Sequence, residues 1–299
     1  MRRGLGMLFA ALVLGACGTT PVAHTPAVRA TSTPPATSGA SPEATVVPSP
    51  ARGAQDAIPG PAGMTLSQEI GAVMMVGFAG PLTPAVVADW RQHQYGGLVI
   101  RPENRNATNP SGFRQLIQEI RAAAGHTLLA ATSQAGANAP ALRALGFDVN
   151  LAPVADVGVA TAVAGIHEAG MYAVVAASPG DTRPLKAAIG AQVEFVLVRH
   201  ASDRDGPAMQ SLRQDLGFRG VAISDDLLAD TNPSLNPPPV AAVHFLAAGG
   251  DMVMVSRDLR IADVTNSAIH AAVLDGTYPR AQLDASVQKL LNLSLKFMP

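Results

Sequence analysis

The feature that most constrains the fold of this chain is an alternation of short apolar runs with helical stretches between residues 64 and 299. Such runs are typical of strands buried on both faces of a parallel sheet, joined by crossover helices. The predicted strands are Val73–Phe78, Gly97–Ile100, Thr127–Thr132, Val149–Val154, Met171–Ala177, Glu194–Arg199, Val221–Ser224 and Met252–Val255. The predicted helices include Pro84–His93, Ser111–Ala124, Ala139–Leu145, Arg183–Ala191, Gly206–Leu216, Pro239–Ala248, Asp258–Leu274 and Arg280–Leu293. Eight strands in about 235 residues fit a single-domain α/β fold, the (β/α)8 TIM-type barrel, which typically needs about 250.

An open doubly wound sheet is the alternative architecture for the same order of elements. No glycine-rich phosphate-binding fingerprint follows the first predicted strand, so the dinucleotide-binding form of that sheet has no support.

One predicted strand ends in a group of polar residues. Val221–Ile223 are apolar, and Ser224, Asp225 and Asp226 follow directly. Carboxylates at the carboxyl end of a buried parallel strand lie where α/β barrels build their active sites. A helix N-cap is the other interpretation, because Ser and Asp favour that position and the helix dipole stabilises their charge. The segment on its own leaves both roles open.

The composition limits the class of partner. The chain has 299 residues and a formal net charge of −1, so it offers no general basic character of the kind that nucleic acids need, and we expect no nucleic-acid partner. Apolar residues make up 48% and aromatic residues 4%, so a sizeable core must be built mainly from Ala, Val, Leu and Ile. No His/Cys cluster or acidic calcium loop is evident, and we expect neither a metal nor a cofactor.

The first residues predict export and lipidation. Arg2 and Arg3 form a positive n-region, and Leu8–Leu14 is an apolar stretch too short to span a bilayer. The following residues, 14–17, resemble the bacterial lipobox, in which the cysteine is lipidated after cleavage before it. Cys17 is the single cysteine of the chain, and an ordinary secretory signal with an incidental cysteine is the alternative. We therefore predict a lipoprotein signal peptide at 1–16 and a lipid anchor on the outer face of the bacterial cell membrane.

Residues 17–63 form the second predicted part of the chain. After the cysteine this segment is rich in Pro, Ala, Thr, Ser and Gly, and no aromatic residue occurs between Phe9 and Phe78. Such a segment cannot bury enough apolar surface to offset its ordering entropy, so it predicts a disordered tether. The barrel then occupies residues 64–299, and the tether holds it away from the membrane.

Several blocks of the predicted barrel together resemble one family. They are Val73–Phe78, Gly96–Ile100, Leu142–Asp156, Leu216–Asp226 and Gly249–Met254. In order and spacing they resemble the N-terminal barrel of glycoside hydrolase family 3, above all the bacterial β-N-acetylhexosaminidases. Each block alone is weak evidence for the resemblance, but the five blocks occur in the same order and spacing, and the resemblance covers essentially all of 64–299.

The resemblance implies a retaining glycosidase. The residue that matches the family's nucleophile, directly after the serine of the seventh strand, is Asp225. It would attack the anomeric carbon, while a second acid about 5–5.5 Å away protonates the leaving oxygen and later activates water. Asp226 is interpreted as a neighbour that orients Asp225 or caps the next turn.

The acid/base loop of the hexosaminidase branch is missing from this sequence. That branch carries a long loop after the fifth strand, which reads Lys-His-Phe-Pro-Gly-His-Gly followed by an Asp-Ser-His element. Here residues 176–182 read Ala-Ala-Ser-Pro-Gly-Asp-Thr, so only the Pro-Gly remains. Asp181 is the candidate replacement acid, and a solvated turn carboxylate is the alternative. Losing a general acid usually lowers the rate by about 10²–10⁴, which predicts weak or absent hydrolysis.

The sugar-binding residues of the family are partly retained. The third strand of the family ends in Asp-Gln-Glu-Gly-Gly, whereas residues 133–137 read Ser-Gln-Ala-Gly-Ala. The second strand ends in Arg101–Asn104, where the family has an apolar residue and then a polar pair. Asp156 and His200 keep family positions at the ends of the fourth and sixth strands; each could bind a sugar hydroxyl or be a satisfied structural group. The substrate-binding candidates are therefore Asp156, His200, Gln134 and Asp226.

Three functions fit these observations. The chain is a surface-anchored hydrolase of N-acetylhexosamine glycans, a non-catalytic barrel that binds a glycan, a cell-wall fragment or a protein, or an envelope scaffold. Because fold does not fix function, the resemblance cannot choose among them, and the sequence leaves the oligomeric state open.

Overall fold

Eight parallel strands form one sheet that closes into a barrel, which confirms the predicted architecture. The computed structural model describes residues 60–107, 109–134, 138–152, 158–177, 182–199, 205–229 and 236–296. The strands are β1 (Met74–Val76), β2 (Gly97–Ile100), β3 (Leu129–Thr132), β4 (Val149–Asn150), β5 (Val174–Ala177), β6 (Phe195–Val198), β7 (Val221–Asp226) and β8 (Met252–Val255). Their order is β4-β3-β2-β1-β8-β7-β6-β5, and a parallel bridge between Val149 and Tyr172 joins the two ends.

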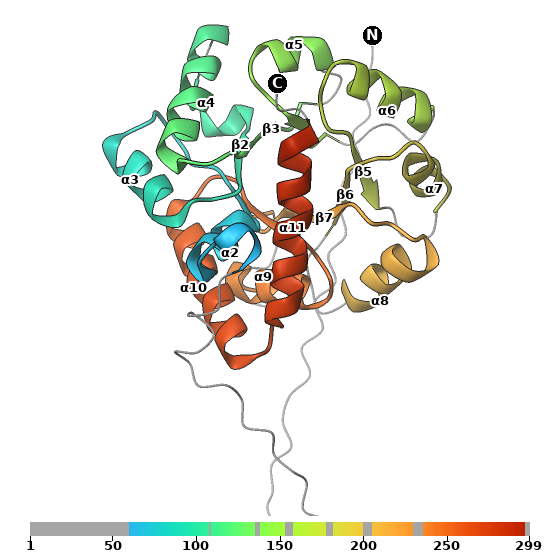
Figure 1. The fold of residues 1–299 in the computed structure, drawn as a ribbon. Coiled ribbons are helices and arrows are strands. Elements are labelled where there is room, and N and C mark those ends of the chain that lie inside the picture. Colours follow the sequence, from blue (N-terminus) through green and yellow to red (C-terminus); the bar gives the residue numbers. More distant parts are fainter. Residues whose placement is uncertain are drawn as a thin grey trace, which may run out of the picture. The chain divides into compact units, whose positions relative to one another are not determined.

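Helices surround the strands, as Figure 1 shows. They are α2 (Leu66–Ala72), α3 (Pro84–His93), α4 (Pro110–Ala124), α5 (Ala139–Ala144), α6 (Val159–Glu168), α7 (Arg183–Gly190), α8 (Asp205–Gln210), α9 (Pro238–Ala247), α10 (Leu259–Asp275) and α11 (Arg280–Lys296). The last of them, α11, crosses the amino end of the barrel, where its side chains reach residues that precede β8 (Figure 1). In the part of the chain that the structure describes, no helix has the length and apolar character to cross a membrane.

Three helical elements differ from the sequence prediction. The helices α2 and α6 were not predicted, and the predicted helix at Gly206–Leu216 divides into α8 and a π-helical segment at Ser211–Asp215. The amino end of α2 is fixed by a capping box, in which Thr65 and Gln68 exchange side-chain to backbone hydrogen bonds. By contrast, α6 begins at Gly158, which has a positive φ and provides no side-chain cap.

The core is built from small apolar residues with a few large aromatic side chains between the barrel and its helices. Trp90 is fully buried and packs edge-on against Tyr95, with 5.2 Å between the ring centroids. Tyr95 and Tyr278 are also fully buried, and Tyr172 is 3% exposed. Every tyrosine of the chain therefore lies in the interior, since the sequence contains three.

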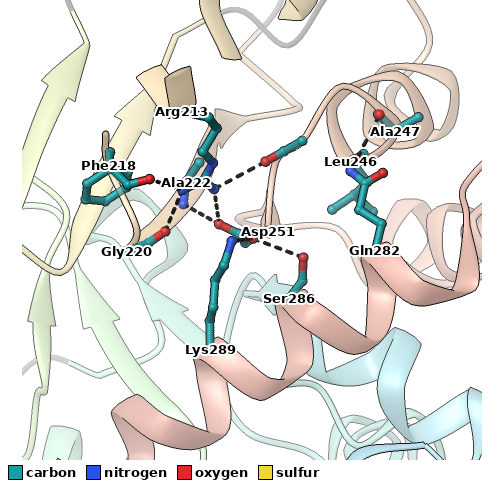
Figure 2. A network of polar contacts seen from close by, with 11 residues as sticks. Arg213, Phe218, Gly220, Ala222, Leu246, Ala247, Asp251, Gln282, Ser286 and Lys289 are labelled. Carbon is teal, nitrogen blue, oxygen red and sulfur yellow. Dashed lines mark hydrogen bonds and ion pairs between the residues drawn. The ribbon is translucent and has the colours of Figure 1, made fainter. Parts of the chain in front are cut away.

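A buried carboxylate organises the amino end of the barrel between β7 and β8 (Figure 2). Asp251, which directly precedes β8, is 1% exposed. Its oxygens accept hydrogen bonds from Arg213 of the π-helical segment, from Lys289 Nζ at 2.6 Å and from Ser286 Oγ at 3.0 Å. It also accepts the backbone N–H of Ala222 at 2.8 Å, so one side chain connects β7, β8, α11 and the π-helical segment.

The same arrangement occurs before two other even-numbered strands. Asp148 precedes β4 and accepts the backbone N–H of Ala130 in β3 at 2.8 Å, and Glu194 precedes β6 and accepts that of Ala173 at 3.1 Å. In each case the carbonyl of the same alanine accepts a backbone N–H from the acid or from the residue after it. A base from the helix before the odd strand completes each unit, and these pairs are Arg121–Asp148, His167–Glu194 and Arg213–Asp251. We call these three units the alanine–acid clasps.

Candidate active site

The carboxyl end of β7 contains a β-bulge that separates the roles of neighbouring residues. Ile223 pairs with Met252 and Asp226 pairs with Met254, so β7 has one residue more than β8 between the two pairs. Ser224 compensates for the extra residue, because its Oγ accepts the backbone N–H of Met254 at 3.0 Å and donates to the carbonyl oxygen of Asp225 at 2.7 Å. Bulges of this kind redirect side chains and are common beside active sites.

The two aspartates after Ser224 lie in different environments. Asp225 is half-buried, and Asp226 is 6% exposed. The Oδ1 atom of Asp226 accepts the backbone N–H groups of Leu228 at 3.2 Å and Ser256 at 3.1 Å, and its Oδ2 accepts Ser256 Oγ at 2.5 Å. Asp226 thus caps the turn after β7 and ties it to the end of β8, whereas Asp225 beside it is the more exposed of the two aspartates.

Arg101 brings a positive charge to this carboxylate pair. It follows β2 directly, and its Nη1 lies 3.4 Å from Asp226 Oδ2 and 3.6 Å from Glu103 Oε1. The loop that begins with Arg101 continues over the barrel end, where Asn104 Nδ2 donates to the carbonyl oxygen of Ser256 at 2.7 Å. Sequence reasoning did not identify Arg101 or Ser256 as site residues. The available signal was a polar residue directly after a buried strand.

Gln134 lies at the same barrel end, after β3, and three strands separate β3 from β7 in the sheet. Its backbone N–H donates to Asn150 Oδ1 at 3.0 Å, and Asn150 Nδ2 donates to the Gln134 carbonyl at 2.9 Å. The side chain of Gln134 is exposed. Asn150 thus fixes the backbone that presents Gln134, a role that the sequence analysis did not assign.

The remaining predicted site residues are not described by the structure. Asp181, Asp156, His200 and Cys17 lie outside the described residues, and their roles stay predictions. Among the predicted site residues, the structure describes Asp225 and Asp226 at the end of β7 and Gln134 after β3. Among the described residues, no cluster of three or more His, Cys, Asp or Glu side chains has the arrangement of a metal site.

A cavity of about 590 Å³ lies at the opposite end of the barrel from Asp225. Its wall includes Gly96 and Thr127 before β2 and β3, and Leu291 of α11. Because α/β-barrel enzymes carry their chemistry at the carboxyl ends of the strands, this cavity is not part of the candidate active site.

Comparison with known proteins shows which family the barrel resembles. Residues 180–293, which include β6, β7 and β8, match the model of the glycosyl hydrolase family 3 N terminal domain. A β-hexosaminidase of Stenotrophomonas maltophilia strain K279a is 24% identical, over 67% of this chain and 86% of the relative. The barrel is similar to the N-terminal domain of glycoside hydrolase family 3.

Solved structures show the same fold over a longer part of this chain. A family 3 β-N-acetylglucosaminidase from Paenibacillus sp. aligns with a TM-score of 0.66 and 22% identity, over 77% of this chain and 62% of the other. A β-N-acetylhexosaminidase from Beutenbergia cavernae aligns with a TM-score of 0.67 and 19% identity, over 77% of this chain and 98% of the other. The structural likeness therefore extends beyond the segment that the family model matches, although this chain spans less than two thirds of the Paenibacillus protein.

Proposed function

We propose that this family 3 barrel binds glycans that contain N-acetylhexosamine at the carboxyl ends of its strands, and that it hydrolyses them slowly with Asp225 as the nucleophile. The observation that carries the proposal is the bulge of β7, which buries Asp226 among hydrogen-bond donors and leaves Asp225 half-buried. Two adjacent carboxylates in different environments suit different tasks, and the more accessible one is the nucleophile.

Slow turnover follows from the sequence of the loop after β5. Residues 176–182 contain no histidine or lysine, and Asp181 is their single acidic residue. We propose Asp181 as a weak acid/base, with Asp156, His200 and Gln134 as ligands for sugar oxygens. A poor general acid limits natural glycosides most, because their leaving groups need protonation.

Hydrolysis by the purified full-length protein tests this proposal. An activated aryl β-N-acetylglucosaminide and a natural N-acetylglucosamine oligosaccharide are compared for the wild type and for Asp225→Asn. Turnover of the aryl substrate with retention of the anomeric configuration, lost in Asp225→Asn, is the expected result. Asp258→Asn is the matched control, since Asp258 caps α10 near the same barrel end and asparagine is an equally good cap.

A non-catalytic glycan-binding barrel is the second candidate. It is favoured by the sequence Ser133–Gln134–Ala135, in which both acids of the family's third-strand motif are absent. Equal inactivity of the wild type and Asp225→Asn on both substrates, together with measurable oligosaccharide binding by calorimetry, would replace the enzymatic proposal with this one.

We further propose that the chain is exported and anchored to the outer face of the bacterial cell membrane through a lipid on Cys17, with residues 17–63 as its tether. The motif at residues 14–17 and the composition of the tether support this proposal. Release of a Cys17→Ala variant from the membrane fraction is the expected result. Unchanged membrane fractionation of that variant would contradict the anchor.

A further inference from the structure

Arg101 crosses the mouth of the barrel to reach Asp226. It follows β2, whereas Asp226 ends β7, and β1 and β8 lie between these two strands in the sheet. On the way its Nη2 lies 3.9 Å from the sulfur of Met254 in β8. The side chain is 19% exposed, and that of Asp226 is 5% exposed. The ion pair is therefore largely removed from water, and it joins the carboxyl ends of β2 and β7.

The ion pair compensates a charge that the barrel would otherwise bury alone. Leu228 N–H, Ser256 N–H and Ser256 Oγ are neutral donors to Asp226, and Arg101 is the cation among its described contacts. Burying a carboxylate without a counter-charge is energetically unfavourable. Arg101 thus supplies this counter-charge and helps to fix the position of the Asp226 side chain.

The arginine itself is incompletely satisfied at this place. Its Nε is buried and has no hydrogen-bond partner among the described residues, and its described contacts with Asp226 and Glu103 are 3.4 and 3.6 Å long. An apolar side chain would fill the same space without an unpaired N–H. Packing alone does not explain why a residue with a buried, unpaired N–H occupies this position. The positive charge that Arg101 brings next to the two aspartates explains it.

We propose that Arg101 is a positioning residue for Asp225. This inference rests on the proposed function. Asp225 and Asp226 share one peptide unit at the end of the bulge, so the carboxylate that Arg101 fixes determines where the backbone of Asp225 lies. The Arg101–Asp226 pair thereby sets the approach of the Asp225 carboxylate to the anomeric carbon.

Steady-state kinetics on the activated aryl substrate test the inference with the full-length protein. In Arg101→Met, kcat is expected to fall by about 10- to 100-fold with a smaller change in KM, because misplacing a reacting group by about 1 Å has an effect of this size. Arg101→Lys keeps the charge and is expected to retain more of kcat. Arg257→Met is the matched control, since Arg257 is exposed and follows β8 at the same end.

A double-mutant cycle distinguishes positioning from a general loss of stability. If Arg101 acts through Asp226, adding Arg101→Met to Asp226→Asn lowers kcat by less than about threefold further. Guanidinium ion in the assay is expected to restore part of kcat to Arg101→Ala and to leave the wild type unchanged. The fluorescence of Trp90 reports whether each variant is folded, and Arg101→Lys carries the test if the other variants are not.

The outcomes separate this inference from the proposed function. Wild-type turnover that Arg101→Met leaves unchanged, or effects of Arg101→Met and Asp226→Asn that multiply independently, would overturn the role of Arg101 alone. Equal inactivity of the wild type and Asp225→Asn would overturn the catalytic proposal and this inference with it.

Discussion

At the scale of single residues, the end of β7 shows how three consecutive polar side chains take three different roles. Ser224 completes the backbone ladder, Asp225 lies half-buried at the barrel end, and Asp226 caps the following turn. The bulge causes this division, because an extra residue in one strand changes the direction of every side chain after it. The Ser-Asp-Asp sequence thus supplies an acceptor for a backbone group as well as two carboxylates.

We predict that Ser224→Ala destabilises the protein by about 1–3 kcal/mol, since the buried N–H of Met254 loses its acceptor. Urea unfolding followed by the fluorescence of Trp90, the single tryptophan of the chain, measures the change. Ser224→Thr, which keeps the hydroxyl, is the control. Equal unfolding midpoints for Ser224→Ala and the wild type would show that the bulge does not depend on this hydrogen bond.

The position of Asp225 could be predicted from the sequence, but the construction of the site around it could not. An apolar strand that ends in Ser-Asp-Asp identifies the barrel end by pattern alone. Arg101 is 125 positions away from Asp226 along the chain, and no local rule relates the two. Ser256 and Asn150 are likewise recognised by their contacts across strands, which appear only when the barrel is closed.

At the scale of elements, the amino end of the barrel is held by the three alanine–acid clasps. The clasp at Asp251 is the most deeply buried, with a carboxylate side chain that is 2% exposed and an arginine that is 20% exposed. In the clasp at Asp148 the carboxylate is 14% exposed; it pairs with Arg121 and also with Arg143 of α5, and each arginine is 36% exposed. Water screens the ion pairs of Asp148 more than those of Asp251. The same kind of ion pair therefore contributes differently to the free energy of unfolding in the two clasps.

Asp251→Asn is therefore expected to lower the free energy of unfolding by about 3–5 kcal/mol, because Arg213 and Lys289 lose their common counter-charge. Asp148→Asn, the matched variant, is expected to lower it by about 1–2 kcal/mol, the sum of two screened pairs. Asparagine still accepts the alanine N–H in both places, so the comparison isolates charge. Denaturant unfolding measures the free energy of unfolding of both variants. Equal decreases for Asp251→Asn and Asp148→Asn would contradict the role of burial.

The elements that sequence patterns missed lacked the signals on which such patterns depend. The helix α2 has seven residues and continues almost directly into β1, so its apolar residues merge with those of the strand. The helix α6 begins at a glycine without a side-chain cap. The π-helical turn at Ser211–Asp215 has no characteristic spacing in the sequence, and its consequence, the approach of Arg213 to Asp251, is visible only in three dimensions.

At the scale of the whole molecule, the interior contains every tyrosine of the chain. Burial raises the pKa of Tyr95, Tyr172 and Tyr278 well above the ordinary value near 10, and nearby carboxylates raise each further. The phenols are consequently protonated in the folded protein under conditions in which the unfolded chain has already released their protons.

Stability is expected to fall as the pH rises past about 10, because the unfolded state then binds fewer protons than the folded state. We predict that the ultraviolet absorbance of tyrosinate stays absent in the folded protein and appears together with the loss of the native fluorescence of Trp90. A tyrosinate signal that develops near pH 10 while the protein remains folded would place at least one phenol in contact with solvent.

The alanine–acid clasps also describe how such a barrel is assembled from parts. Each clasp joins an odd strand to the even strand that follows it, at β3–β4, β5–β6 and β7–β8. Between β1 and β2 no clasp is found among the described residues, and there the Gly96 N–H donates to the Gly71 carbonyl at 2.9 Å. Three of the four strand pairs are thus joined in the same way, and a barrel made by repeating the β7–β8 pair four times would have a clasp at every even strand.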